Sequence, residues 1–548
     1  MKDFRTCLKG LREMSRPLRG QIAVSCLIGV VRIAASMAFV WICKVLVDIA
    51  TGVLDAPLGR HIWIMALILL VQLLSATAAS WWEGMTVTKA QNRTRAEVFS
   101  HVLDSCWRGR EAFHSGDTVN RLEEDIRVLV DLLCSRIPDI VVTVLQLLAA
   151  SAYLFTLEPS LLWVLLVLMP VAAIGSKMFF RVIRELTSKI RAGDSAVQSF
   201  MQETLLHRVL VKTLTTSESV MDKMNGLQED VMDNTIKRLN YNAVARSFMR
   251  FGFLSGYAAA FLWGVFGIRS GAVTYGMMTA FLQLVGQVQR PIAGLSQHIP
   301  AFIHSLTSVE RLLELTDLPL ETRTEDVVFD GAPGIRVEDI SFAYRDVPEG
   351  MEPQKVFEHF SYDFRPGSIT AIMGITGAGK STLTRLVLSL LQPDSGEITM
   401  YLDGRSVPVS ADTRCNFRYV PQGNSLMSGT VRENLLLARP SATESEMAQA
   451  LHLAVADFVF DLPCGLDTVC SEKGSGLSEG QAQRIAIARA LLHGGGVLIL
   501  DEATSALDAV TEATLLARLN EKMNGGKTII WITHRESVTG IADAVLKI

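Results

Sequence analysis

Apolar stretches long enough to cross a lipid bilayer fill much of the N-terminal half of this 548-residue chain. A transmembrane helix needs about 20 consecutive, mostly apolar residues. The sequence offers about six such stretches, near residues 22–47, 62–85, 137–155, 161–180, 248–268 and 277–298. The hydrophobic share of 49% and the mean hydropathy of +0.30 are also high for a soluble protein. The chain is therefore predicted to begin with an all-α membrane domain of six spans.

Basic residues predict which side of the membrane each loop faces. The connections after the second and fourth spans are long and rich in Lys and Arg, as is the N-terminus, whereas the other connections are short. By the positive-inside rule, the N-terminus, both long loops and the C-terminal part lie in the cytoplasm. The first residues resemble neither a cleaved signal peptide nor an organellar transit peptide, which favours a bacterial inner membrane.

Polar residues recur at helical spacing on one face of the first and sixth spans. The candidates are Arg32 in the first span and Gln283, Gln287 and Arg290 in the sixth. Such groups are costly in lipid, so they usually face protein or a water-filled cavity. Two interpretations stay open: these faces pack the helices together, or they line a cavity for a transported molecule. The two arginines would suit an anionic or amphipathic substrate such as a lipid, a drug or a peptide.

Charge and cysteine content exclude other classes of protein. The formal net charge is only −4 and no basic stripe is present, so nucleic acid is not expected as a partner. The eight cysteines are scattered, with no spacing typical of metal ligands, and are interpreted as reduced thiols.

Composition changes after residue 315. A stretch rich in charge and turn-forming residues, 316–334, is predicted to be a linker between the membrane domain, 1–315, and a second domain, 335–548. In the second domain, short β-like runs alternate with helical segments, which indicates a parallel α/β sheet.

A phosphate-binding loop follows the first β-like run of that domain. Residues 374–381, GITGAGKS, fit the pattern G-x-x-x-x-G-K-[ST]. Glycines let backbone N–H groups wrap phosphates, and the next helix presents its positive dipole end to them. Lys380 should reach the β- and γ-phosphates, and Ser381 should bind Mg²⁺. The candidate ATP-binding residues of this loop are Gly374, Thr376, Gly377, Gly379, Lys380, Ser381 and Thr382.

Two carboxylates close a second apolar run, VLILDE. A buried strand that ends in this way places Asp501 near the Mg²⁺ and Glu502 where it can polarise the attacking water. Beside a phosphate loop, this interpretation is preferred to a solvated acidic turn.

These motifs, together with Leu477-Ser478-Glu479-Gly480-Gln481, resemble those of ABC transporters, specifically exporter-type half-transporters with a membrane domain followed by an ATPase domain. The resemblance covers nearly the whole chain. It extends to the coupling regions of the membrane domain, FHSGDTVNRLEED and QETLLHRVLVKTLTT.

The resemblance implies roles for further residues. Tyr344 would stack on adenine, Gln422 would contact Mg²⁺ and communicate with the membrane domain, and His534 would lie near the γ-phosphate. The signature residues would bind the ATP held by a second chain, and the loop ending at Asp508 would cross the dimer interface. These residues are Ser478, Gly480, Gln481 and Asp508. Catalysis would rest on Glu502, His534 and Gln422, with Ser381, Gln422 and Asp501 around the metal.

The sequence departs from the family pattern in two places. Glu479 replaces the usual middle glycine of the signature, and we expect this to be tolerated because Ser478 and the helix-start N–H groups are retained. The chain also stops at Ile548, without the usual terminal hairpin and helices, which indicates either a minimal or a truncated ATPase domain.

In the family each ATP lies between two chains, so a partner half-transporter is expected. A homodimer is favoured over a heterodimer because one chain carries all the catalytic motifs. Export driven by ATP hydrolysis is the preferred function. An importer of similar architecture and an ATP-regulated membrane sensor or channel remain the alternatives.

Overall fold

The computed structural model describes residues 4–107, 115–344, 354–375, 377–470, 476–523 and 526–548. Contacts between Cα atoms divide the chain into two units. Unit 1 comprises residues 1–99 and 119–316, and unit 2 comprises residues 100–118 and 317–548. Thr376, one of the predicted phosphate-loop residues, lies outside the described residues.

The described part of unit 1 consists of helices and their connections, and two of these helices extend into unit 2: the helix that ends at Asp104 and the helix that begins at Ser115. The helices are α1 (Phe4–Ser15), α2 (Arg19–Ala50), α3 (Leu58–Asp104), α4 (Ser115–Asn120), α5 (Ile126–Asp131), α6 (Ile137–Leu157), α7 (Pro159–Lys177), α8 (Phe180–Leu206), α9 (Arg208–Thr213), α10 (Ser217–Arg269) and α11 (Tyr275–Thr316). Two wider helical turns, Arg121–Asp125 and Leu132–Arg136, connect α4, α5 and α6. The predicted all-α membrane domain is confirmed.

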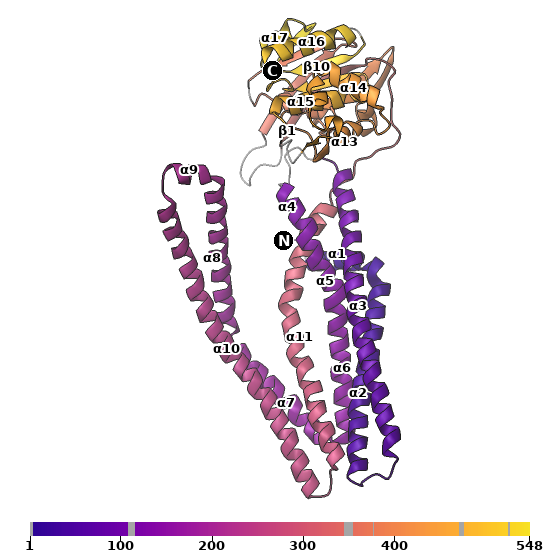
Figure 1. Ribbon diagram of the computed structural model, residues 1–548, viewed down its shortest axis with the longest axis vertical. Helices are drawn as coiled ribbons and strands as arrows, with labels where there is room; N and C mark the ends of the chain where they lie inside the picture. The colour runs from indigo at the N-terminus through magenta and orange to yellow at the C-terminus, as the bar shows by residue number, and fades with distance from the viewer. Residues whose placement is uncertain (1–3, 108–114, 345–353, 376, 471–475, 524–525) are drawn as a thin grey trace. The chain divides into compact units, whose positions relative to one another are not determined.

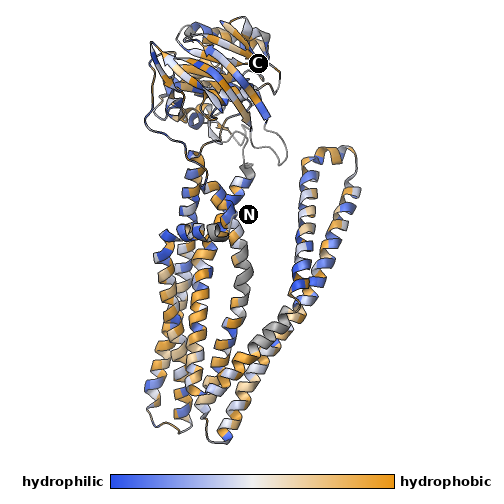
Figure 2. Ribbon diagram, turned by 180° about the vertical axis from the view of Figure 1, so that it is seen from behind, coloured by the Kyte–Doolittle hydropathy of each residue, from blue (hydrophilic) through white to orange (hydrophobic). Residues whose placement is uncertain are grey.

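Four helical segments among the described residues are long and apolar enough to cross a membrane: Lys9–Ala50, Leu58–Asp104, Asp117–Leu157 and Ser217–Arg269. They contain the first, second, third and fifth predicted spans. The fourth predicted span falls on α7 and runs past its end at Lys177, and the sixth falls on α11. Figure 2 shows hydrophobic residues along α2, α3 and α6, and a more hydrophilic mixture on α8.

Small residues determine how closely the helices of unit 1 approach one another. α10 packs against α7, α8 and α11, and α11 also packs against α2 and α6. Along α10, Gly252, Gly256, Ala260 and Gly264 are buried at four-residue spacing. A Cβ atom at Gly256 would lie 1.9 Å from the side-chain nitrogen of Gln289, so any larger residue would require this buried side chain to move.

Unit 2 contains two larger sheets. The first is parallel, with strand order β11-β3-β10-β9-β6, and the second is antiparallel, with order β2-β1-β4-β5. The strands are β1 (Gly334–Tyr344), β2 (Gln354–Phe364), β3 (Ile369–Met373), β4 (Ser395–Leu402), β5 (Arg405–Pro408), β6 (Phe417–Val420), β7 (Gly429–Thr430), β8 (Val469–Cys470), β9 (Val497–Asp501), β10 (Thr528–Ile532) and β11 (Ala544–Lys547). The predicted parallel α/β sheet is confirmed.

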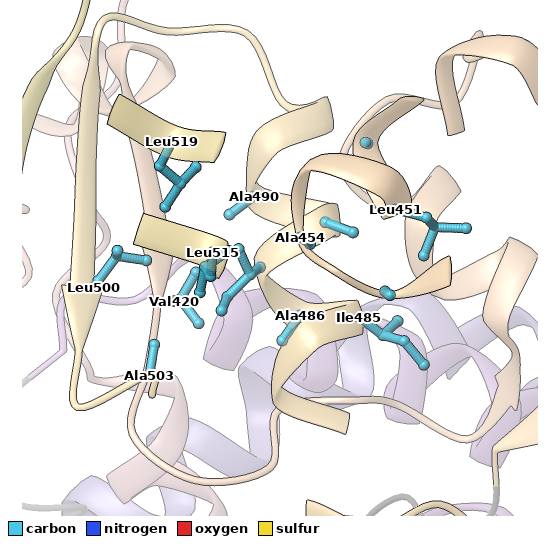
Figure 3. Close-up of a cluster of buried hydrophobic side chains, with 14 of the residues drawn as sticks. Val420, Leu451, Ala454, Ile485, Ala486, Ala490, Leu500, Ala503, Leu515 and Leu519 are labelled. Atoms are coloured by element: carbon cyan, nitrogen blue, oxygen red, sulfur yellow. The ribbon is translucent and has the colours of Figure 1, made fainter. Parts of the chain in front are cut away.

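Helices cover the parallel sheet and complete the core of unit 2. They are α12 (Lys380–Val387), α13 (Val431–Leu436), α14 (Glu444–Leu453), α15 (Glu479–Leu492), α16 (Ala509–Met523) and α17 (Glu536–Thr539) (Figure 1). Figure 3 shows Leu500 of β9 and Val420 of β6 packed with Ile485 of α15 and Leu515 of α16. This core fixes the carboxyl ends of β3 and β9, where the candidate site lies.

The stretch predicted as a linker is part of unit 2 from residue 317 onward. Phe329 is buried in its core, and its backbone N–H donates to the side-chain oxygen of Asn416. Glu321 accepts two hydrogen bonds from the guanidinium of Arg414. Turn-forming composition indicates where a regular element ends, but it does not show whether the segment is held by side-chain contacts.

Candidate nucleotide-binding site

The phosphate loop lies between β3 and α12, as the sequence predicts. Gly377 and Gly379 have φ values of 90° and 99°, a region that residues with a Cβ atom rarely adopt. The Nζ atom of Lys380 donates to the carbonyl oxygens of Gly374, at 2.7 Å, and Ile375, at 3.2 Å. The ammonium group therefore lies across the loop, where a phosphate could replace these carbonyl acceptors.

Asp501 ends the buried strand β9 and lies beside Ser381. The Asp501 carboxylate accepts hydrogen bonds from the hydroxyl groups of Ser381 and, at 3.4 Å, Tyr419. Burial raises the pKa of Asp501, and the adjacent charge of Glu502 adds to this effect, whereas the two hydroxyl groups act in the opposite direction. A hydroxyl and a buried carboxylate are oxygen ligands that suit Mg²⁺, whose charge would offset that desolvation.

Glu502 contacts both of the other predicted catalytic residues, Gln422 and His534. Its Oε2 accepts a hydrogen bond from Nε2 of Gln422 at 2.8 Å, and its Oε1 lies 3.0 Å from Nε2 of His534. The φ of Glu502 is 49°, an uncommon value for a residue with a side chain and one often found at functional sites.

His534 also lies near the phosphate loop. Its Nε2 is 3.2 Å from Nζ of Lys380 as well as 3.0 Å from Glu502. One ring nitrogen can donate to the carboxylate or accept from the ammonium group, but not both at once. The histidine can therefore exchange partners when the charge in the site changes.

A cavity of about 340 Å³ connects these groups. It is lined by Tyr344, Gln354, Val356, Gly377, Gly379, Lys380, Ser381, Thr382, Gln422, Glu502 and His534. Residues from distant parts of the sequence thus converge on one hollow beside the phosphate loop. Gln354 and Val356, at the start of β2, are lining residues that no sequence motif indicated.

Tyr344 lines this cavity, but most of its ring is buried. The side chain packs edge-on against Phe342, with ring centroids 5.0 Å apart, and its hydroxyl lies 3.1 Å from that of Thr382. Arg385 also approaches the Tyr344 hydroxyl, at 3.4 Å. Stacking on adenine stays a prediction.

The signature residues lie at the start of α15 and do not line the cavity described above. Ser478 and Gln481 form reciprocal hydrogen bonds between their side chains and backbone N–H groups, which caps the helix. Glu479 occupies the exposed first turn, where a negative charge is favourable. A Cβ atom at Gly480 would lie 2.7 Å from the carbonyl oxygen of Ala506, so glycine is required there.

Asp508 begins α16. Its carboxylate accepts hydrogen bonds from the backbone N–H groups of Val510 and Thr511 and from the Thr511 hydroxyl. The hydrogen bonds from Thr511 hold the pKa of Asp508 below its usual value. Asp508 thus orders the loop that precedes α16.

Two residues to which sequence reasoning gave no role bind that loop, Ser505–Asp508. Gln483 bonds to the Ser505 hydroxyl at 3.1 Å and to the backbone N–H of Ala506 at 3.2 Å. Arg535 donates at 2.9 Å to the carbonyl oxygens of both Ser505 and Leu507. The sequence signal was adjacency, since Gln483 follows the signature and Arg535 follows His534.

Replacing Arg535 by Gln is expected to lower ATP turnover about 10-fold or more. The carbonyl oxygens of Ser505 and Leu507 lose their hydrogen-bond donor, so the loop that they belong to shifts relative to the catalytic residues. The guanidinium also pairs at 2.9 Å with Glu512, which is only 3% exposed. Its loss should therefore lower the unfolding temperature as well. Turnover and thermal unfolding of the purified protein measure the two effects.

Adding Glu512→Gln to Arg535→Gln separates these effects, because it removes the unpaired buried charge. We expect the unfolding temperature to rise again while turnover stays low. Recovery of turnover together with stability would show that Arg535 acts only on folding.

The α/β domain contains a phosphate loop, two adjacent carboxylates and a histidine beside them, and it follows a helical membrane domain. These features together define a nucleotide-dependent membrane protein. The chain belongs to the ABC transporter family. Residues 22–292 match the family model described as "ABC transporter transmembrane region", and residues 357–505 match the family model described as "ABC transporter".

Similar proteins align with most of this chain. A Bacillus subtilis protein named for multidrug export is 26% identical, covering 98% of this chain and 94% of that protein. An ATP-dependent lipid A-core flippase of Desulfotalea psychrophila is 28% identical, covering 82% of this chain and 78% of that protein. The structure of a bacterial Atm1-family ABC exporter with ATP bound has the same fold, with a TM-score of 0.78, 23% identity and coverage of 97% and 94%.

Proposed function

We propose that this chain is one half of an ATP-driven exporter of amphipathic molecules, such as lipids, drugs or peptides, and that it works as a dimer in a bacterial inner membrane. The observation that carries the proposal is the convergence of Lys380, Gln422, Glu502 and His534 on one cavity beside the phosphate loop. The proposed domains are the membrane domain, 1–315, the linker, 316–334, and a cytoplasmic ATPase domain, 335–548.

The site residues divide the work of ATP hydrolysis between them. Lys380 releases the carbonyl oxygens of its loop and binds the β- and γ-phosphates. Ser381 and Asp501, with Gln422, would hold a Mg²⁺ ion, which would neutralise developing phosphate charge. Glu502 accepts a proton from the attacking water or orients it, and His534 contacts the γ-phosphate.

A second chain completes each ATP site. Ser478, Gly480 and Gln481 lie outside the cavity that the same chain forms, at the positive end of the α15 dipole. ATP held by a partner would replace the capping hydrogen bonds that Ser478 and Gln481 now make with each other. A homodimer is favoured because one chain contains both halves of the site. ATP binding would then shift the dimer towards a closed state to the extent that ATP binds that state more tightly.

The tip of the α8–α10 pair supports coupling to an ATPase domain (Figure 1). Around α9, the large apolar side chains are exposed by 54–79%: Leu205, Leu206, Val209, Leu210 and Leu214. An apolar group at the end of two polar helices needs a partner surface. We assign this segment as the second coupling region.

The first coupling region is tied to the end of α11. Arg121 is buried and its guanidinium bonds to Glu314 at 2.6 Å and to the carbonyl oxygen of Arg311 at 3.0 Å. Asp125, also buried, pairs with Arg311 at 3.2 Å. A shift of this region would therefore move the helix that precedes the linker, which is the connection that transport requires.

The four substrate residues proposed from the sequence come from two helices, α2 and α11. Arg32 lines a cavity between α2, α3 and α6, whereas Gln283, Gln287 and Arg290 of α11 are absent from the described lining of that cavity. We keep the α11 residues as candidates for the translocation pathway. The relatives named for multidrug export and lipid flipping support an amphipathic substrate.

ATP-driven transport by proteoliposomes tests the function. We expect ATP turnover to rise with one class of lipid, drug or peptide, and that molecule to accumulate inside vesicles whose ATPase domains face outward. The Glu502→Gln protein is the matched control and should accumulate nothing. Depletion of the molecule from those vesicles would indicate import, and ATP-dependent conductance without accumulation would indicate a channel.

A further inference from the structure

A polar cavity of about 250 Å³ lies within unit 1, between α2, α3 and α6. A Cβ atom at Gly29 would lie 2.2 Å from a methyl carbon of Val142, so the glycine lets α2 and α6 close the floor of the cavity. The charged and aromatic side chains that line it are Arg32, Trp82, Glu83, Asp131, Arg136 and Asp139. The cavity does not belong to the nucleotide site.

The position of the cavity along its helices places it at the cytoplasmic face of the membrane. At 1.5 Å per residue, Arg32, Glu83 and Asp139 lie roughly 27 to 38 Å from the outer ends of α2, α3 and α6. A hydrocarbon core of about 30 Å would end at this level. Trp81 and Trp82 stand here too, and tryptophan is enriched at membrane interfaces. The cavity therefore faces the headgroups of the cytoplasmic leaflet.

Two opposite charges in the cavity are available to a ligand. Arg136 is paired with Asp131 at 3.0 Å. Arg32 on α2 and Glu83 on α3 are both exposed, and neither has an ion pair or a side-chain hydrogen bond with any side chain that the structure describes. A guanidinium suits a phosphate, and a carboxylate suits a primary ammonium group.

We propose that this cavity binds the headgroup of a phospholipid that carries both a phosphate and a primary ammonium group, as phosphatidylethanolamine does. Arg32 binds the phosphate and Glu83 accepts from the ammonium group. The volume is below that of pockets for drug-sized ligands, roughly 300–1,000 Å³, so the headgroup enters and the acyl chains stay in the bilayer. An anionic headgroup without an amine would leave Glu83 unpaired and would face Asp131 and Asp139.

Binding of short-chain lipids to the full-length protein in detergent tests this site. Dihexanoyl phosphatidylethanolamine should bind saturably and at least about 10-fold more tightly than its phosphatidylcholine and phosphatidylglycerol counterparts, because these lack N–H donors on a cation. Equal affinity for the three lipids would overturn the proposal. Glycerophosphoethanolamine, which has no acyl chains, should bind more weakly; equal binding would instead make the free headgroup the ligand and overturn the lipid assignment.

Substitutions of Arg32 and Glu83 test whether the lipid binds in this cavity. Arg32→Gln and Glu83→Gln should each weaken phosphatidylethanolamine binding about 10-fold, while Arg32→Lys and Glu83→Asp, which keep the charges, should retain part of it. Lys89→Gln removes a positive charge from the exposed surface of α3 outside the cavity and should change nothing. Wild-type binding by both neutral variants would contradict the assignment.

This lipid site requires that the three helices span the membrane, but it does not require that the protein transports a substrate. Loss of the lipid preference in a protein that still transports would reject the site alone. Lipid binding by a protein without ATP turnover would reject the proposed function and leave the site.

Discussion

Glu502→Gln is expected to lower ATP turnover by about 10²-fold or more and to leave ATP binding within about twofold, because general-base catalysis contributes roughly 10²–10⁴-fold. An amide has nearly the shape of the carboxylate, so the side chain can still contact Gln422 and His534. It cannot accept a proton from water at neutral pH. The measurement is phosphate release by the protein in lipid, beside equilibrium binding of ATP.

Glu521→Gln is the matched control for this change, because Glu521 is an exposed carboxylate of α16 in the same domain. It should leave both quantities unaltered. Wild-type turnover in the Glu502→Gln protein would remove Glu502 from catalysis. Loss of ATP binding would instead show that the carboxylate is needed to maintain the structure of the site. The backbone of Glu502 has a positive φ of 49°, an uncommon conformation that its side-chain contacts would then stabilise.

The sequence was sufficient to predict those parts of the site whose function depends on a local motif. The glycines before Lys380 need left-handed backbone, and Asp501 follows directly on a buried strand, so the order of residues implies their geometry. Gln483 and Arg535 were not predictable in this way. Their roles come from where α15 and the end of β10 lie relative to Ser505–Asp508, which depends on packing of the whole core.

In the membrane domain, hydropathy predicted which segments are helices but not which helices share a polar surface. Arg32 and Arg290 each lie on the polar face of a predicted span, and the sequence suggested a common cavity for them. In the structure Arg32 lines one cavity together with Glu83 and Asp139, and Arg290 is not among the residues that line it. Helical periodicity gives the direction in which a side chain points from the axis of its helix. Which helix it then faces depends on close contacts between helices, such as that of Gly29 with Val142.

The second large effect follows from the separation of Lys380 and Ser478 within one chain. Lys380 lines the cavity, whereas Ser478 caps α15 and is not among its lining residues. If ATP is bound between the phosphate loop of one chain and the signature of another, a chain defective in one half can be complemented by a chain defective in the other. If one chain binds ATP alone, no mixture can restore the site.

Chains carrying Lys380→Ala or Ser478→Arg should each retain less than about a tenth of the bound ATP, because loss of charge-assisted hydrogen bonds to phosphate costs roughly 1.5–3 kcal/mol each. All chains also carry Glu502→Gln, so that bound ATP persists, and differently tagged chains allow the mixed dimer to be purified. This dimer has one site with both defects and one intact site, so it should retain one ATP per dimer. Retention no greater than in the two parent dimers would contradict the shared site, whereas one ATP per mixed dimer assigns Lys380 and Ser478 to opposite sides of the same nucleotide.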